Sequence, residues 1–144
     1  MDKFLVDDQK ALKELYSDCL QAMKKSYSPY SKTAVGACIW TKDGKKIYGA
    51  NIENASYGLT VCAERTAMFS AHLDGVKKED QIVLGIAADF TGYAYPCGAC
   101  RQVMAELLPF SCPVVMFDPK GNYKIINVGE IMPGIFTKDD LKNL

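Results

Sequence analysis

The sequence lacks an excess of charge of either sign, because 17 Lys and Arg residues are balanced by 17 Asp and Glu residues. A protein whose main partner is nucleic acid usually presents a basic face to the phosphate backbone. The balance therefore argues against nucleic acid as the main partner and leaves room only for a local basic patch.

Long apolar runs are also missing. No run reaches the roughly 20 residues that a membrane-spanning helix needs, and the opening Met1-Asp2-Lys3-Phe4 lacks the apolar core of a signal peptide. Repeats, low-complexity tracts and linkers are absent as well. We therefore expect one domain over residues 1–144, located in the cytoplasm, with enough apolar residues (49%) to form a core.

The hydrophobic pattern predicts alternating helices and strands. A helix starts at Leu12 and ends before Ser28-Pro29, since the residue before proline avoids the helical region. The order helix, two strands, helix, strand, helix, two strands indicates an α/β domain with helices packed on a sheet. The later elements are expected at residues 33–40, 46–50, 63–73, 81–88, 100–108, 114–117 and 123–128, with a short helical turn after Thr137.

Six cysteines stand at positions 19, 38, 62, 97, 100 and 112. A disulfide framework is disfavoured, because the domain is large enough for a core and shows no secretory signal. Cys19 and Cys38 fall in apolar patterns and are interpreted as small buried hydrophobes, and Cys112 receives no role. Cys62, in Cys62-Ala63-Glu64, and the pair in Pro96-Cys97-Gly98-Ala99-Cys100 remain.

These three cysteines form the expected zinc site. Zinc binds thiolates well, and three protein ligands leave one position open for catalysis. The segment of Cys62 and the segment Cys97-x-x-Cys100 each stand where a helix is expected to begin, and a helix N-terminus favours a thiolate. Glu64 is the expected proton carrier in a hydrolytic deamination of the kind that this ligand pattern marks. Arg65 and Arg101, beside the ligands, are expected to donate hydrogen bonds to the sulfurs, one or both of them.

Simpler interpretations exist for each of these residues. A closed site with Cys112 as fourth ligand would be structural, and a zinc-stabilised binding module would need no catalysis. Glu64 argues against that module, because a structural site has no use for a proton carrier. His72, the single histidine, stands midway along a helix and is interpreted as a packing or surface residue.

A polar segment follows the second predicted strand. Asn51 and Glu53 alternate on one side of this extended stretch, where an amide and a carboxylate could grip a sugar; a polar turn is the alternative. Tyr93 and Tyr95 flank Pro96 and either line the pocket or pack the loop.

Taken together, the motifs resemble the cytidine deaminases of the small, homotetrameric, zinc-dependent kind. The resemblance runs from the first helix to Phe136, nearly the whole chain. Its motifs are Ser28-Pro29-Tyr30-Ser31-Lys32, Val35-Gly36-Ala37, Asn51-Ile52-Glu53-Asn54-Ala55-Ser56-Tyr57-Gly58, Cys62-Ala63-Glu64-Arg65-Thr66-Ala67 and Pro96-Cys97-Gly98-Ala99-Cys100-Arg101-Gln102.

The resemblance implies a three-layer α-β-α sandwich with a mixed five-stranded sheet, a pyrimidine nucleoside substrate, and one Zn²⁺ per subunit. It implies active sites at the subunit interfaces of a homotetramer. The residues it implicates are Cys62, Cys97 and Cys100 as zinc ligands, Glu64 as proton shuttle, Arg65 as neutraliser of ligand charge, Asn51 and Glu53 at the ribose, the Ala63 backbone and Phe136 at the base, and Ala55 and Tyr57 from neighbouring subunits.

One position departs from the family pattern. The family typically has phenylalanine after Ser-Lys, packed against the pyrimidine, where this chain has Thr33. Thr33 implies a wider pocket if nothing else fills the space, so modified cytidines join cytidine and deoxycytidine as expected substrates. The alternatives are a deaminase of an aminonucleoside antibiotic such as blasticidin S and a nucleic-acid editing enzyme. The intact Asn51 and Glu53 argue against the first, and the balanced charge and short loops against the second.

Overall fold

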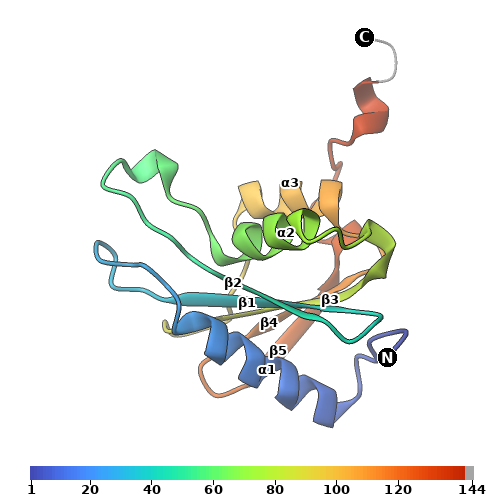
Figure 1. Ribbon diagram of the computed structural model, residues 1–144, viewed down its shortest axis with the longest axis horizontal. Coiled ribbons are helices and arrows are strands. Elements are labelled where there is room, and N and C mark those ends of the chain that lie inside the picture. The colour runs from blue at the N-terminus through green and yellow to red at the C-terminus, as the bar shows by residue number, and fades with distance from the viewer. Residues whose placement is uncertain (142–144) are drawn as a thin grey trace.

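The computed structural model describes residues 1–141, so the last three residues of the expected domain lie outside the described part of the chain. Its elements form three layers (Figure 1): one helix covers one face of a five-stranded sheet, and two helices cover the other. The elements are α1 (Gln9–Met23), β1 (Val35–Thr41), β2 (Lys46–Ala50), α2 (Ala63–Leu73), β3 (Gln81–Ala88), α3 (Gly98–Leu107), β4 (Pro113–Phe117) and β5 (Tyr123–Asn127).

The sheet has the strand order β2-β1-β3-β4-β5. β1 pairs antiparallel with both β2 and β3, β4 pairs parallel with β3, and β5 pairs antiparallel with β4. The parallel pair is the one joined through a helix, α3, as a parallel connection requires. The expectation of a mixed five-stranded sheet in an α-β-α sandwich is confirmed.

Burial on both faces explains the composition of the central strand. All eight residues of β3 are buried, because α1 packs on one side of it and α2 and α3 pack on the other. A strand covered on both faces can be almost continuously apolar, as Ile82-Val83-Leu84-Gly85-Ile86 is. The sheet therefore separates two hydrophobic clusters, one beneath α1 and one beneath α2 and α3.

The first helix begins earlier than its apolar pattern indicates. Asp8 stands in an extended conformation, and its carboxylate accepts a hydrogen bond of 3.0 Å from the Ala11 N–H, so α1 starts at Gln9 and not at Leu12. Within residues 1–141, none of the helices combines the length and the apolar character needed to cross a membrane.

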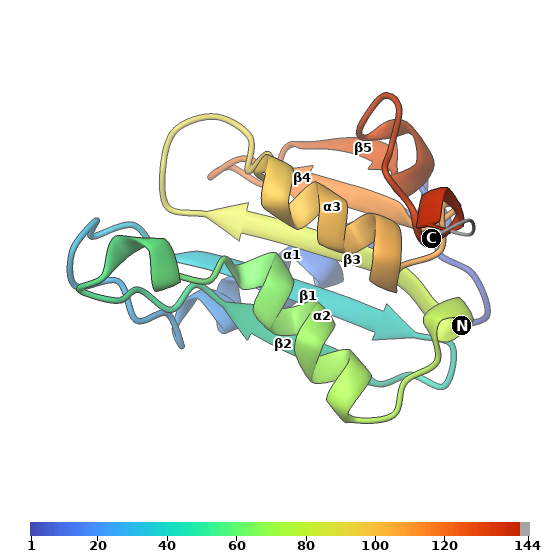
Figure 2. The same ribbon diagram turned by 90° about the horizontal axis from the view of Figure 1, so that it is seen from above.

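The two helices on the upper face begin at the same end of the sheet (Figure 2). α2 lies close to β2 because Gly49 has no side chain; a Cβ atom there would stand 2.3 Å from the Ala63 carbonyl oxygen. Thr66 fixes the same contact, since its hydroxyl accepts from the Ala50 N–H at 3.0 Å and donates to the Ala63 carbonyl at 2.9 Å. The start of α2 is thereby held against the end of β2.

Candidate zinc and substrate site

Three thiols meet between the starts of α2 and α3. Cys62 is the residue before α2, Cys97 is the residue before α3, and Cys100 lies one turn into α3. The Sγ atoms of Cys62 and Cys97 are 3.8 Å apart, those of Cys97 and Cys100 are 3.5 Å apart, and all three lie within 4.8 Å of one another. The sequence prediction that these cysteines converge is confirmed.

The spacing of the sulfurs suits zinc. Thiolates at about 2.3 Å from a tetrahedral Zn²⁺ lie about 3.8 Å apart. Cys112 is not part of the group: its thiol is buried in the core and lies 3.7 Å from the Pro113 carbonyl oxygen. Because the described residues supply three thiols and not four, the closed structural site with Cys112 is wrong, and one coordination position is left for a water or substrate.

The two arginines beside the ligands have different partners. Arg65 donates from Nη2 to the Cys62 sulfur at 3.4 Å. Arg101 donates instead to backbone carbonyls, to Pro96 at 2.9 Å and to Ile131 at 2.7 Å. Of the two expected donors to sulfur, only Arg65 therefore has that role within residues 1–141, and Arg101 fixes the loop that carries Cys97.

Hydrogen bonding controls the charge on the sulfurs. The Cys100 thiol, followed by the Arg65 guanidinium and Cys97, lowers the pKa of Cys62 in spite of its partial burial. The hydrogen bond to Cys62 in turn raises the pKa of Arg65, so this side chain remains a cation. The cluster thus favours a thiolate at Cys62, which is the form that binds a metal.

Glu64 lies beside the thiols and is almost fully enclosed. Its side chain is on the first turn of α2, and the residue is only 4% exposed. Burial raises the pKa of Glu64 to about 7, and the negative charge of Cys62 acts in the same direction. A carboxyl group with such a pKa can both accept and release a proton near neutral pH.

A cavity of about 190 Å³ opens above these groups. Its lining includes Glu64, Ala63, Cys62 and Cys97 on one side and Asn51 at the end of β2. Sequence reasoning missed its other lining residues, which are Val35, Thr60, Ile86, Phe90 and Ala94, and left Tyr95 undecided between the pocket and the loop. Tyr95 lines the cavity, whereas Tyr93 packs against the core.

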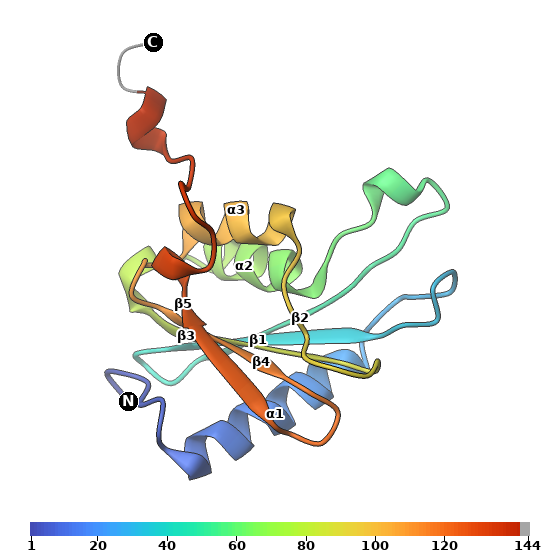
Figure 3. The ribbon, with the colours of Figure 1, turned by 180° about the vertical axis from the view of Figure 1, so that it is seen from behind.

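A second cavity of about 300 Å³ lies next to the first. It is lined by Tyr30, Ser31, Glu53, Tyr57 and Thr60, and Thr60 lines both cavities. The loop between α1 and β1 and the loop between β2 and α2 form this cavity. They run side by side beyond the sheet (Figure 3) and are joined by a parallel bridge between Tyr27 and Ile52. The arrangement is a partly open cavity over the thiols that adjoins a second cavity lined by Glu53, Ser31 and two tyrosines.

Asn51 and Glu53 organise the loop that faces them. The Asn51 Oδ1 atom accepts from Ser26 and from the Val35 N–H at 2.9 Å, and its Nδ2 donates to the Thr33 carbonyl at 2.8 Å. The Glu53 carboxylate accepts from the N–H groups of Tyr30 and Ser31, at 3.0 and 3.1 Å, and from the Ser31 hydroxyl. Both side chains are therefore held in place at the rims of the cavities.

The remaining predicted site residues do not line the cavity above Glu64. Thr33 lines neither cavity, and its hydroxyl faces the Ser31 carbonyl at 3.5 Å. Ala55 is exposed on the loop after β2, and Tyr57 is 73% exposed while lining the second cavity of its own chain. Phe136 is 53% exposed and lies outside both cavities; its carbonyl accepts from Gln102 at 2.7 Å. Contacts of these residues with a base or a neighbouring subunit stay predictions.

Known proteins are similar to this chain in sequence. Residues 9–116 match the family described as the cytidine and deoxycytidylate deaminase zinc-binding region. The chain is 47% identical over 129 residues to the cytidine deaminase of Halalkalibacterium halodurans, covering 90% of this chain and 96% of the relative. It is 43% identical over 130 residues to the cytidine deaminase of Sporosarcina psychrophila, covering 90% and 94%.

Solved structures are similar over the same length. The crystal structure of cytidine deaminase from Burkholderia pseudomallei superimposes with a TM-score of 0.83 at 41% identity, covering 86% of this chain and 98% of that one. The cytidine deaminase of Mycobacterium tuberculosis gives a TM-score of 0.74 at 32% identity, covering 87% and 96%. The similarity therefore extends over nearly the whole fold and is not confined to the cysteine motifs.

Proposed function

The chain belongs to the cytidine deaminase family, and we propose that Glu64 and the three-thiol cluster beneath the cavity carry out its reaction. The enzyme is a hydrolase: water adds to the amine-bearing carbon of cytidine, the carbon–nitrogen bond breaks, and uridine and ammonia leave. The observation that carries the proposal is the placement of one buried carboxyl group beside three thiols, two of which line the same cavity as the carboxyl group.

Cys62, Cys97 and Cys100 hold Zn²⁺ in this proposal, and Arg65 withdraws charge from the Cys62 sulfur. When bound, the metal supplies Lewis acidity that eases the loss of a proton from water near neutral pH. Glu64 accepts that proton and passes it to the ring nitrogen. It then takes a second proton from the hydroxyl group added at the carbon and gives it to the amine, which leaves as ammonia while the carbonyl of uridine forms. One carboxyl group serves these steps because its raised pKa makes both protonation states accessible.

The second cavity holds the sugar. Glu53 lines the second cavity and Asn51 lines the first, and they present a carboxylate and an amide suited to ribose hydroxyl groups. The Ala63 backbone, at the floor of the first cavity, contacts the base. This placement supports a nucleoside, with the base over Glu64 and the sugar directed toward Glu53.

The assembled enzyme is a homotetramer in the cytoplasm in this proposal. Ala55, Tyr57 and Phe136 are exposed in one chain and would complete the active site of a neighbouring subunit. None of the six cysteines forms a disulfide, which fits a reducing compartment, and the zinc cluster requires three of them as free thiols.

Replacing the proton carrier tests the chemistry. We expect Glu64→Gln to lower kcat for cytidine by about 10³-fold, since general acid–base catalysis contributes that order of rate, while zinc content stays at one ion per chain. Ammonia release and metal analysis on the purified holoenzyme measure the two quantities. Glu106→Gln, the same change on the exposed side of α3, serves as the control and should keep full activity. A fully active Glu64→Gln would contradict the assignment.

A further inference from the structure

Two aromatic side chains from one loop line the cavity above Glu64. Phe90 and Tyr95 lie between β3 and α3, and their residues are 42% and 51% exposed. The other lining residues offer small aliphatic, polar or thiol groups. Large apolar rings that stay partly open at the mouth of a cavity provide a surface on which a flat ring can pack.

The loop that carries these rings is fixed at both ends. The Asp89 N–H donates to the Ala34 carbonyl at 3.0 Å, and the Asp89 carboxylate accepts from the Ala34 N–H at 2.9 Å. At the other end the Ala94 N–H donates to the Phe117 carbonyl at 3.0 Å. Phe90 and Tyr95 therefore stand next to anchored residues and keep their places relative to Glu64.

Tyr95 has further support from β5. The Lys124 ammonium group lies 4.9 Å from the centre of the Tyr93 ring and 5.8 Å from that of Tyr95, and the two ring centres are 6.2 Å apart. Such cation–π contacts hold a ring in position. Within residues 1–141 Phe90 has no comparable contact with another ring or with a cation. The Tyr95 ring is therefore held in position, and the Phe90 ring is available to pack against a ligand.

The volumes indicate which part of a nucleoside meets this wall. Pockets that enclose a whole drug-sized ligand usually have about 300–1,000 Å³, and the cavity beside Phe90 has about 190 Å³. It suits a single ring, with the rest of the nucleoside in the adjoining cavity beyond Thr60.

We propose that Phe90 and Tyr95 form an aromatic wall against which the pyrimidine packs, and that Phe90 is a specificity-determining residue that limits the size of substituents on the ring. The proposal rests on the proposed function, which places the base above Glu64. Thr33 lines neither cavity, so this wall supplies the aromatic surface that position 33 lacks.

Kinetics of Phe90→Ala on the zinc-loaded enzyme test the wall. We expect KM for cytidine to rise about tenfold, because base–aromatic stacking is typically worth that much on alanine substitution, while kcat changes less than threefold. The ratio of kcat/KM for 5-bromocytidine to that for cytidine should rise at least threefold, since removing the ring makes room. Phe90→Leu keeps the bulk without the aromatic face and should raise KM while leaving this ratio near the wild-type value.

Phe110→Ala is the matched control, because Phe110 is similarly exposed (47%) and lies outside both cavities. Phe110→Ala should leave unchanged both the KM for cytidine and the ratio of kcat/KM for 5-bromocytidine to that for cytidine. Suppose that the wild-type enzyme deaminates cytidine and that Phe90→Ala has the wild-type KM and selectivity. This result would overturn the proposed aromatic wall and leave the proposed function standing. A wild-type enzyme that releases no ammonia from cytidine would overturn the proposed function and the wall together.

Discussion

The cysteines of this protein differ in thiol pKa according to what surrounds them. Burial raises the pKa values of Cys38 and Cys112 to about 12, so these thiols stay protonated and act as small apolar groups. Hydrogen bonds with Cys100, Arg65 and Cys97 lower the pKa of Cys62. The spacing Cys-x-x-Cys was sufficient to predict that Cys97 and Cys100 lie on one turn. Cys62 was added because it stands in Cys62-Ala63-Glu64, beside the expected proton carrier.

Metal analysis of two cysteine variants distinguishes a proposed zinc ligand, Cys97, from a buried core thiol, Cys112. Cys97→Ser should lose zinc and activity and should unfold more easily, since metal binding and folding are coupled. Cys112→Ala should keep one zinc per chain and full activity, and should lose roughly 1 kcal/mol of stability through the small core vacancy. Loss of zinc from Cys112→Ala would show that a fourth sulfur takes part in binding.

Other residues of the site could not be predicted from their sequence neighbours. Arg101 stands next to Cys100, yet it bonds to the Ile131 carbonyl, 30 residues away. Phe90 reaches the cavity because Asp89 is tied to Ala34, 55 residues earlier in the chain. Contacts of this kind depend on the folded arrangement of the strands, which local patterns do not encode.

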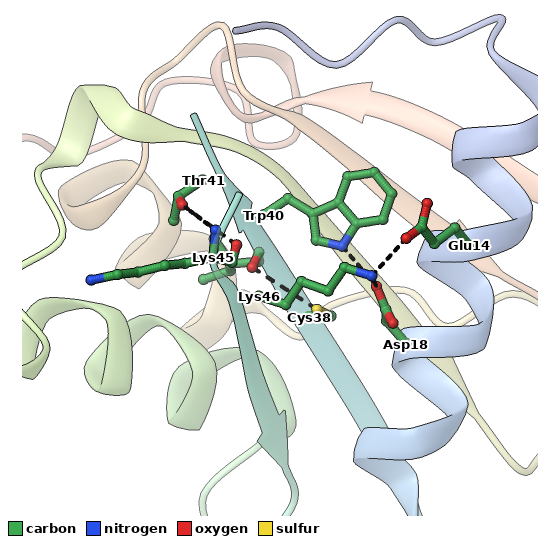
Figure 4. Close-up of polar contacts among 8 residues, drawn as sticks. Glu14, Asp18, Cys38, Trp40, Thr41, Lys45 and Lys46 are labelled. Atoms are coloured by element: carbon green, nitrogen blue, oxygen red, sulfur yellow. Dashed lines mark hydrogen bonds and ion pairs between the residues drawn. The ribbon is translucent and has the colours of Figure 1, made fainter. Parts of the chain in front are cut away.

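Among the secondary-structure elements, α1 has an unusual attachment to the sheet (Figure 4). Asp18 is buried and accepts from the Trp40 Nε1–H at 2.9 Å, and the Lys46 ammonium group lies 3.0 Å from Asp18 and 2.8 Å from Glu14. Lys46 also stands 5.3 Å from the centre of the Trp40 ring. One helix carboxylate therefore joins α1 to both β1 and β2.

Substitution of Asp18 or of Glu14 compares the stability contributed by a buried and by an exposed partner of Lys46. Asp18→Ala should lower the free energy of unfolding by about 2 kcal/mol, because it leaves the buried Trp40 N–H without an acceptor. Glu14→Ala, whose side chain is 53% exposed, should cost less than about 1 kcal/mol. Urea unfolding followed by circular dichroism measures both, and equal losses would contradict the role assigned to Asp18.

Helices and strands were predicted with small errors at their ends. The second strand, the second helix and the third strand have the expected bounds, while α1 starts three residues early because of the Asp8 cap. The strand order was not accessible from the residues themselves, since it is set by pairings between distant segments. The resemblance to a known family supplied the mixed sheet instead.

The whole molecule presents apolar side chains on the outer side of α2 and on the loop after β2. Tyr57 and Leu59 are 73% and 67% exposed, and Phe69 and Leu73 are 44% and 83% exposed. A contiguous exposed apolar patch commonly marks a contact between proteins, and this is the role that the proposed assembly gives these side chains. In the proposed homotetramer, neighbouring subunits cover these side chains.

Light scattering after gel filtration tests the assembly. The wild-type protein should elute with four times the 15.9 kDa mass of one chain. Leu59→Asp should reduce this mass and lower kcat/KM for cytidine at least tenfold, because an uncompensated charge is costly in an apolar contact. Leu5→Asp, the same change at a 53% exposed residue in the segment before α1, should alter neither. A monomeric, fully active wild-type enzyme would contradict the shared active site.

The Asn51 amide has a consequence for how substrate binds. Its oxygen and nitrogen already hold the segments around Ser26, Thr33 and Val35 before any nucleoside arrives. The part of the first cavity that Asn51 lines is therefore preorganised, and little conformational entropy remains to be lost there on association. In the proposed binding mode, encounter with the nucleoside would then resemble docking onto a rigid template, and discrimination among sugars would rest on the fit of their hydroxyl groups and not on rearrangement of the chain.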